Sequence, residues 1–256
     1  MAIAMGVAAA TAVLTGALLI GQSMRQSLRE LSLDRLGRTD EMLVSQGFFN
    51  PQAVAPSKSA ASSLTVAAIL FNNGTVETEA PTNQAQRASN VNVFGVPDEF
   101  WKLDLGDGAV KKLAGEGVAI NQALADELGI GEQTLDTPLT LRIPKPTQLP
   151  AESALAANRD LIESLVGLQV LQILPNQGIA GFSLHASQLD SPNLFVPIEL
   201  LQDALSRKAL RHKSDTNQAN VAFMSRGKEG GGSGSLKSFL EPVSYTHLTL
   251  PTTPYV

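Results

Sequence analysis

Cysteine is missing from this sequence of 256 residues. Its absence excludes disulfide bonds, thiolate nucleophiles and zinc sites built on cysteine from the chemistry of the chain. It does not identify a compartment, because many exported bacterial proteins also lack cysteine.

Charged residues are scarce as well. They make up 17 % of the chain, and the net charge is −5, whereas soluble domains usually carry about a quarter of charged residues. A nucleic-acid partner requires clustered lysine and arginine to neutralise phosphates, so this composition argues against one. With 43 % hydrophobic residues, the chain is long enough to bury a sizeable core in one or two domains.

No charge occurs before Arg25. A helix of about twenty residues spans about 30 Å, which is the thickness of the hydrocarbon core of a bilayer. The run is rich in alanine and glycine, as are membrane helices that pack on other helices. A cleaved signal peptide would need a positive region before the apolar run, and none is present. We therefore predict a retained transmembrane helix over residues 1–24.

The next segment, 25–39, is predicted to continue as an amphipathic stalk helix. Apolar residues recur there at roughly helical spacing, with Arg and Glu between them: Met24, Leu28, Leu31 and Leu36. Gly37 is the expected C′ residue that ends the helix. The stalk is expected to leave the bilayer and to pack on the next domain.

The orientation of the span has two interpretations. The basic residues Arg25, Arg29, Arg35 and Arg38 all follow it, and the positive-inside rule alone would put that side in the cytoplasm. Alternatively, a basic stretch precedes Met1 in the complete protein, and the N-terminus is cytoplasmic. We favour the second interpretation, since the other end of the chain also indicates a fragment.

Residues 40–242 mix short strands with isolated helices, which predicts an α+β domain. An Asn73-Gly74 turn is expected to fold residues 63–79 into a hairpin. An amphipathic helix is expected over 117–129, with Ile120, Leu124 and Leu128 on its apolar side and Gly129 at its end. The other expected elements are strands at 42–49, 88–97, 138–146, 163–175, 178–187 and 217–225, a short helix at 98–103, a strand running into a helix over 193–207, and a flexible loop at 227–235.

The glycine-rich loop is the first candidate for chemistry. A phosphate loop needs spaced glycines before Gly-Lys-Ser/Thr, but Gly227-Lys228 is followed by Glu229, which would repel phosphate. A plain loop is therefore expected. His185 and His212 form neither a metal signature nor a catalytic triad by their spacing, and His185 is expected at the rim of a strand.

Carboxylates and aromatic residues give no site either. Asp126-Glu127 lies on the polar face of its predicted helix, and Asp40-Glu41 is expected in a loop or cap after the stalk. Trp101, beside Phe100, is expected in the core; the alternative, a ligand-stacking role, has nothing else in the sequence to support it. We therefore predict no catalytic, cofactor-binding or metal-binding residues, no cofactor and no enzymatic activity.

The C-terminal tail has an unusual composition. Both tyrosines of the chain, Tyr245 and Tyr255, lie in it, together with His247. Its stretch VSYTHLTLPT is similar to the transposase mosaic end and adapter of a common sequencing library, translated in one frame. We interpret residues 243–256 as an artefactual tail and exclude them from fold reasoning. The natural sequence is then expected to end near Glu241 or Pro242.

Several motifs resemble one family. ALLIGQSMRQSLRELSLDRLGRTDEMLVSQGFF (17–49) is similar to the first membrane helix and stalk of FtsX-like ABC transporter permeases, although Gly21-Gln22-Ser23 stands where relatives typically have Gly-Asp-Ser. VFGVPDEFW (93–101), GVAINQALADELGI (117–130) and NLFVPIELLQ (193–202) resemble, in order, segments of the MacB-like periplasmic core domain. The Gly-Asp turn that normally follows the second segment is altered here. The resemblance covers roughly residues 18–240.

The resemblance implies a non-catalytic permease subunit of an ABC transporter in the inner (cytoplasmic) membrane. Such permeases have one N-terminal span, an extracytoplasmic domain and three further spans near the C-terminus. Residues 40–242 would be an incomplete MacB-like periplasmic core domain. The implied partners are a cytoplasmic ABC ATP-binding subunit, a second permease in a homodimer or pair, and the lipid bilayer. The implied activity is export or extraction of a lipoprotein, peptide or other amphiphile.

Two other classes stay open. The chain could be a single-span, membrane-anchored extracytoplasmic binding module that needs no ATPase, or an anchored enzyme, which the residues support least. Three more apolar spans encoded beyond Glu241 would distinguish the permease from the binding module.

Overall fold

The computed structural model describes residues 2–54, 63–79, 85–106, 110, 112–135, 137–144, 162–184, 189–206 and 218–226. The α-helices are α1 (Ala2–Leu36), α2 (Gln122–Glu127) and α3 (Ile198–Ser206). The strands are β1 (Glu41–Phe49), β2 (Ser63–Thr78), β3 (Arg87–Val96), β4 (Gly117–Asn121), β5 (Pro138–Pro144), β6 (Ile162–Leu174), β7 (Asn193–Pro197) and β8 (Ala219–Arg226). Short 3₁₀ helices are η1 (Pro51–Val54), η2 (Asp98–Leu103), η3 (Glu132–Thr134) and η4 (Gly178–Gly181).

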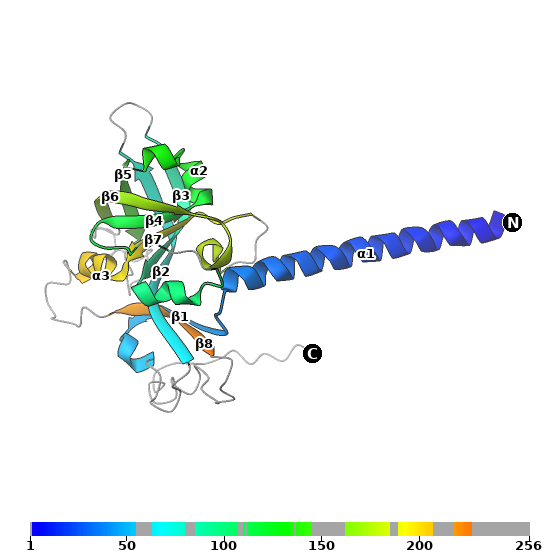
Figure 1. Ribbon diagram of the computed structural model, residues 1–256, viewed down its shortest axis with the longest axis horizontal. Helices are drawn as coiled ribbons and strands as arrows, with labels where there is room; N and C mark the ends of the chain where they lie inside the picture. Colours follow the sequence, from blue (N-terminus) through cyan, green and yellow to red (C-terminus); the bar gives the residue numbers. More distant parts are fainter. Residues whose placement is uncertain are drawn as a thin grey trace, which may run out of the picture.

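The strands form one mixed sheet in the order β1-β8-β2-β3-β7-β4-β6-β5 (Figure 1). The end of β2 also pairs with β5, so β2, β3, β7, β4, β6 and β5 close into a ring. The beginning of β2 leaves the ring and pairs with β8, which in turn pairs with β1. Closure pairs both edges of each strand in the ring, which removes the open edges that invite wrong pairing.

Core side chains cover both faces of the central part of this sheet. Side chains from all six ring strands form an inner core, to which α2 and α3 add Leu124 and Leu201. An outer core lies on the opposite face, where β8, η2 and η4 contribute. Adjacent residues of one strand point to opposite faces, so Leu194 enters the inner core and Phe195 the outer one. In the outer core Phe195 stacks on Phe94 with ring centroids 5.1 Å apart.

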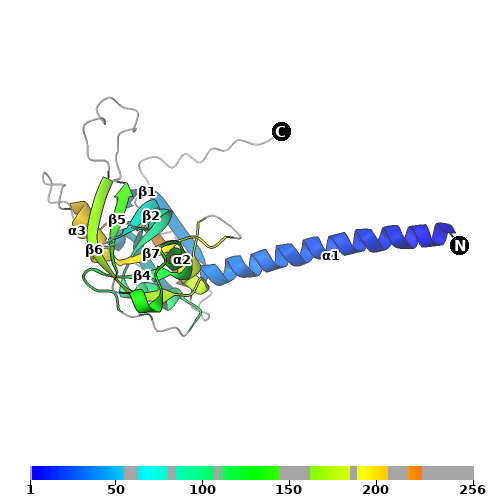
Figure 2. The ribbon, with the colours of Figure 1, turned by 90° about the horizontal axis from the view of Figure 1, so that it is seen from above.

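Helix α1 is continuous and projects away from the domain (Figures 1 and 2). Its 35 residues correspond to a length of about 52 Å at 1.5 Å per residue. By length and composition it could cross a membrane. Gly37 ends it with φ 59°, a left-handed conformation that confirms the expected C′ residue. A side chain at Gly37 would also collide with the carbonyl oxygen of Leu103.

The expected α+β class is confirmed, and so are most of the expected elements. The strands expected at 42–49, 88–97, 138–146, 163–175 and 217–225 correspond to β1, β3, β5, β6 and β8. The segment 98–103 is η2, and 193–206 is β7 followed by α3. The loop at 227–235 and the tail from 243 lie outside the described residues.

The predicted hairpin at 63–79 is wrong, because β2 runs without a turn from Ser63 to Thr78. The pairing register with β3 shifts between Phe71 and Gly74, so a bulge at Asn72 and Asn73 directly precedes Gly74. Asn90, with φ 58°, lies where the register shifts back. Gly74 is required there by close approach, since a Cβ would lie 2.5 Å from the Val93 side chain. The glycine therefore serves packing and not a turn.

The helix predicted over 117–129 is too long. Gly117–Asn121 is strand β4, and helix α2 occupies only Gln122–Glu127. Leu124 and Leu128 are buried as expected, and Gly129 follows the helix with φ 61°. All five residues of β4 are buried, so its run carries no alternation that would distinguish a strand from a helix.

The strand predicted over 178–187 is also wrong. Gly178–Gly181 forms η4, and the described residues that follow it, as far as 184, are not a strand. The carbonyls of Ala180 and Phe182 accept hydrogen bonds from the Asn193 side-chain amide, where a strand would bond to the backbone of a neighbouring strand.

Candidate functional site

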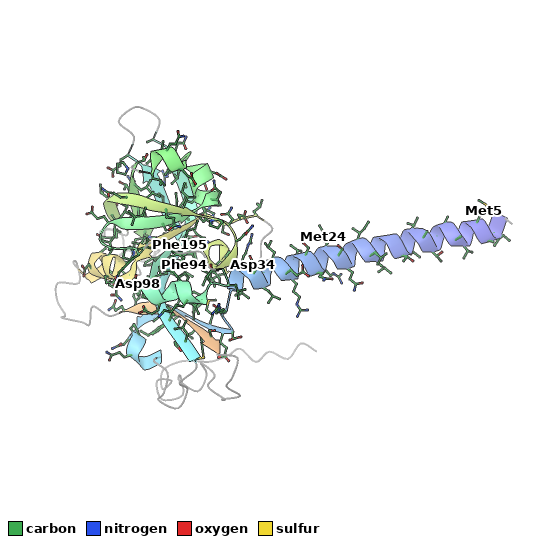
Figure 3. All side chains as sticks on the ribbon, in the orientation of Figure 1. Met5, Met24, Asp34, Phe94, Asp98 and Phe195 are labelled. Atoms are coloured by element: carbon green, nitrogen blue, oxygen red, sulfur yellow. The ribbon has the colours of Figure 1, made fainter. Side chains whose placement is uncertain are left out.

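The last turn of α1 is locked into the domain. Figure 3 shows Asp34 where the helix meets the domain, whereas Met24 and Met5 lie along the projecting part. Asp34 Oδ2 accepts a hydrogen bond of 2.9 Å from the backbone N–H of Gly178 in η4. After the helix ends, the backbone N–H of Arg38 donates to the Leu103 carbonyl at 2.7 Å. The helix thus enters the domain between η4 and the end of η2.

Arg35 is the charged residue buried at this junction, with 6 % of its surface exposed. Its Nη2 lies 2.5 Å from Asp190 Oδ1, and the Asp190 side chain remains 42 % exposed. Asn176 Nδ2 donates to the other carboxylate oxygen of Asp190 at 2.8 Å. We call Asp34, Arg35, Asn176, η4 and Asp190 the stalk socket.

Two buried asparagines support the socket from inside the domain. Asn193 Nδ2 donates to the carbonyls of Ala180 and Phe182 at 2.9 and 2.8 Å. Asn121 Oδ1 accepts from the Asn193 backbone N–H at 2.9 Å and from the Leu124 N–H at 3.1 Å. Both asparagines are fully buried. Buried amides of this kind are retained only where their hydrogen bonds are satisfied, which fixes the geometry of the loops around the helix base.

The expected packing of the stalk on the domain is limited to this last turn. Arg35 is buried, and Leu31 and Leu36 are half-buried. Met24 and Leu28, expected on the packing face, are 57 % and 36 % exposed. The prediction that the apolar side of segment 25–39 packs on the domain is therefore wrong for the beginning of the segment, because that part of the helix lies outside the domain.

The other candidates from the sequence lie apart from the socket. The carboxylates of Asp126 and Glu127 are exposed, and Asp126 accepts a hydrogen bond from Gln122. The pair Asp40-Glu41 continues into β1, where the Asp40 N–H donates to the Met224 carbonyl. Phe100 is buried, and the half-buried Trp101 packs on it and on Phe195.

The remaining candidates from the sequence are the histidines and possible metal ligands. His185, His212 and His247, like the glycine-rich loop, lie outside the described residues. Within the part of the chain that the structure describes, no group of three or more His, Cys, Asp or Glu side chains could hold a metal ion.

Sequence reasoning missed the residues that build the socket. It noted Arg35 as one basic residue after the span, but it gave no role to Asn121, Asn176 or Asp190. One local signal was present: Asn121 directly precedes α2 and is its N-cap, a preferred position for asparagine. The other contacts join residues up to 155 positions apart, and no local pattern predicts them.

Comparisons with known proteins return structures only. No protein-family model and no curated protein matches the sequence. One similar solved structure is the extracellular domain of the noncanonic ABC-type transporter YknZ from Gram-positive bacteria, with 11 % identity, a TM-score of 0.41, and coverage of 78 % of this chain and 87 % of that one. Another is the periplasmic region of MacB from Actinobacillus actinomycetemcomitans, with 9 % identity, a TM-score of 0.43, and coverage of 82 % and 86 %.

Proposed function

We propose that this chain is the front part of a permease subunit of an ABC transporter, in which α1 crosses the membrane and links an extracytoplasmic domain to a cytoplasmic ATP-binding partner. The observation that carries the proposal is the single helix α1. Its first part is apolar and exposed along its length, and its last turn is locked into the domain. Such a helix transmits displacement because it contains no break between the apolar span and the domain.

The sequence motifs also support a permease that works with a separate ATP-hydrolysing partner. The motifs of segments 17–49, 93–101, 117–130 and 193–202 follow the order of an FtsX-like permease with a MacB-like core domain. The chain would supply binding and shape change in the outer domain, while its partner hydrolyses ATP. The cargo class that fits is an amphiphile such as a lipoprotein or peptide, which is exported or extracted, and the permease would work as a pair.

Membrane orientation is the first test. Because the native chain has no cysteine, single cysteines report their own location without further changes. With Ser27→Cys and Glu127→Cys, intact cells are expected to react with a membrane-impermeant maleimide, since both positions are exposed and extracytoplasmic in the proposal. With Ile3→Cys, labelling is expected only after permeabilisation. The reverse pattern would place the domain in the cytoplasm and refute the proposal.

The second candidate is a single-span anchored binding module, which the same helix and domain would also fit. The source locus distinguishes the two when it is sequenced through the codon for Glu241 in both directions. A permease requires three further apolar stretches of about twenty residues in frame. A stop codon without such stretches would leave the binding module as the function.

A further inference from the structure

We propose that Arg35, Asp190 and Asn176 form a polar relay that ties the orientation of the stalk to the first turn of α2. The relay runs from α1 to α2 through Asp190 and Asn176, which lie on either side of η4 in the sequence. In transport it would let a tilt of the membrane helix change the surface around α2, and that use rests on the proposed function. The relay itself is a property of the domain.

The three contacts follow one another in series. Arg35 Nη2 meets Asp190 Oδ1, the Asn176 amide donates to Asp190 Oδ2, and Asn176 Oδ1 accepts from the Ala123 N–H at 2.9 Å. Asp190 thus uses a different oxygen for each partner, and Asn176 uses both atoms of its amide. Neither side chain can turn toward one partner without loosening the other.

The burial of the relay differs between its ends. The Arg35 side chain is 7 % exposed, so its guanidinium cannot exchange Asp190 for water without leaving the socket. Asp190 and Asn176 lie nearer the surface, since the Asp190 side chain is 42 % exposed and Asn176 is half-buried. Both Arg35 and Asn176 donate to the Asp190 carboxylate, but only the bond from Arg35 joins two opposite charges, so the buried cation is the stronger constraint on the position of Asp190.

Helix α2 is sensitive to this contact because it is short. Its six residues are too few for a stable isolated helix, so its first turn depends on capping. Asn121 caps the Leu124 N–H, and Asn176 supplies the acceptor for the Ala123 N–H. Loss of the second bond leaves the helix in place, held by Asn121 and by the buried Leu124, but frees the Ala123 N–H.

Hydrogen exchange on the whole chain in detergent micelles tests the relay. The variants are Arg35→Lys, Asp190→Asn and Asn176→Ala, with Arg29→Lys as the matched control, since Arg29 is an exposed residue of the same helix. We expect exchange at the start of α2 to accelerate about tenfold in all three variants, because local opening becomes easier there. The control is expected to match the wild type. Amides of β4, which pairs with β6 and β7, serve as the internal reference and should not change.

Two results would overturn the relay. The first is faster exchange at α2 in Asn176→Ala alone, with Arg35→Lys and Asp190→Asn unchanged, which would make Asn176 a simple helix cap. The second is equal acceleration at α2 and β4, which would mean general destabilisation. The exchange result is independent of membrane orientation, so a reversed labelling pattern would refute the proposed function and leave the relay standing.

Discussion

Replacing Asn193 should destabilise the domain more than replacing any exposed asparagine. Its side chain is fully buried, and its Nδ2 donates to the carbonyls of Ala180 and Phe182. Its Oδ1 accepts from Asn92, which is half-buried. Asn193→Leu keeps the branched shape and the number of heavy atoms but removes both N–H donors, so the carbonyl oxygens of Ala180 and Phe182 lose this partner in the protein interior.

The expected magnitude follows from these two carbonyls. Each buried group that loses its hydrogen bond costs about 1–3 kcal/mol, so the pair should cost about 4 kcal/mol. The Asn92 amide can turn to water, so it adds little. With a urea dependence of about 2 kcal/mol per molar, the midpoint of unfolding should fall by about 2 M.

The single tryptophan provides the assay. Trp101 packs 5.1 Å from the ring of Phe195, two residues after Asn193, so its fluorescence reports unfolding of this region. Urea titrations of the chain in micelles would compare the wild type, Asn193→Leu and the control Asn72→Leu, whose asparagine is exposed. A shift below about 0.5 M for Asn193→Leu, equal to that of the control, would refute a structural role for the buried amide.

Three further predictions concern other parts of the molecule. Gly74→Ala should destabilise the domain by about 1–3 kcal/mol because its Cβ collides with a buried valine, whereas Asn73→Thr should change stability by less than about 0.5 kcal/mol. Urea unfolding midpoints measure both effects, and a larger loss of stability in Asn73→Thr than in Gly74→Ala would favour a turn. Leu28→Pro breaks α1 at a cost of about 3 kcal/mol or more and, under the proposed function, should uncouple ATP hydrolysis from transport. Normal transport by a normally expressed variant of the full-length protein would contradict this prediction. The hydrogen bond to Asp98 raises the pKa of Lys112 above its ordinary value of 10.5. The ion pair therefore stabilises the fold below that pH, and this contribution is lost as the pH rises through the folded-state pKa. An NMR titration should show that the pKa of Lys112 falls in Asp98→Asn.

Strand β5 was predicted correctly because it has one polar face. In β5 the buried residues Leu139, Leu141 and Ile143 alternate with exposed or half-buried ones such as Arg142, and the strand was located correctly. In β4 both faces are covered by a core, so every residue is apolar or buried. A short apolar run of that kind fits a helical period as well as a strand, which is why the helix was extended back to Gly117.

The missed bulge has a different cause. Asn-Gly between apolar runs is a strong local signal for a hairpin, and the Asn73-Gly74 pair matches this pattern. The sheet overrides the signal because β2 pairs with β8 at its beginning, with β3 along its later part and with β5 at its end. A hairpin would break these pairings, and no local pattern could reveal partners as distant as Arg226.

The stalk socket was beyond prediction for a further physical reason. A helix can be held in a domain by an apolar pocket alone, and replacing buried ion pairs by well-packed apolar residues is often neutral or stabilising. Apolar contacts, however, tolerate rotation of a helix about its own axis, whereas hydrogen bonds do not. The polar contacts of Arg35, Asp34 and the asparagine amides therefore fix the orientation of the helix more than they strengthen its attachment to the domain. In the proposed permease these polar contacts would fix the orientation of the membrane helix at the point where it enters the domain.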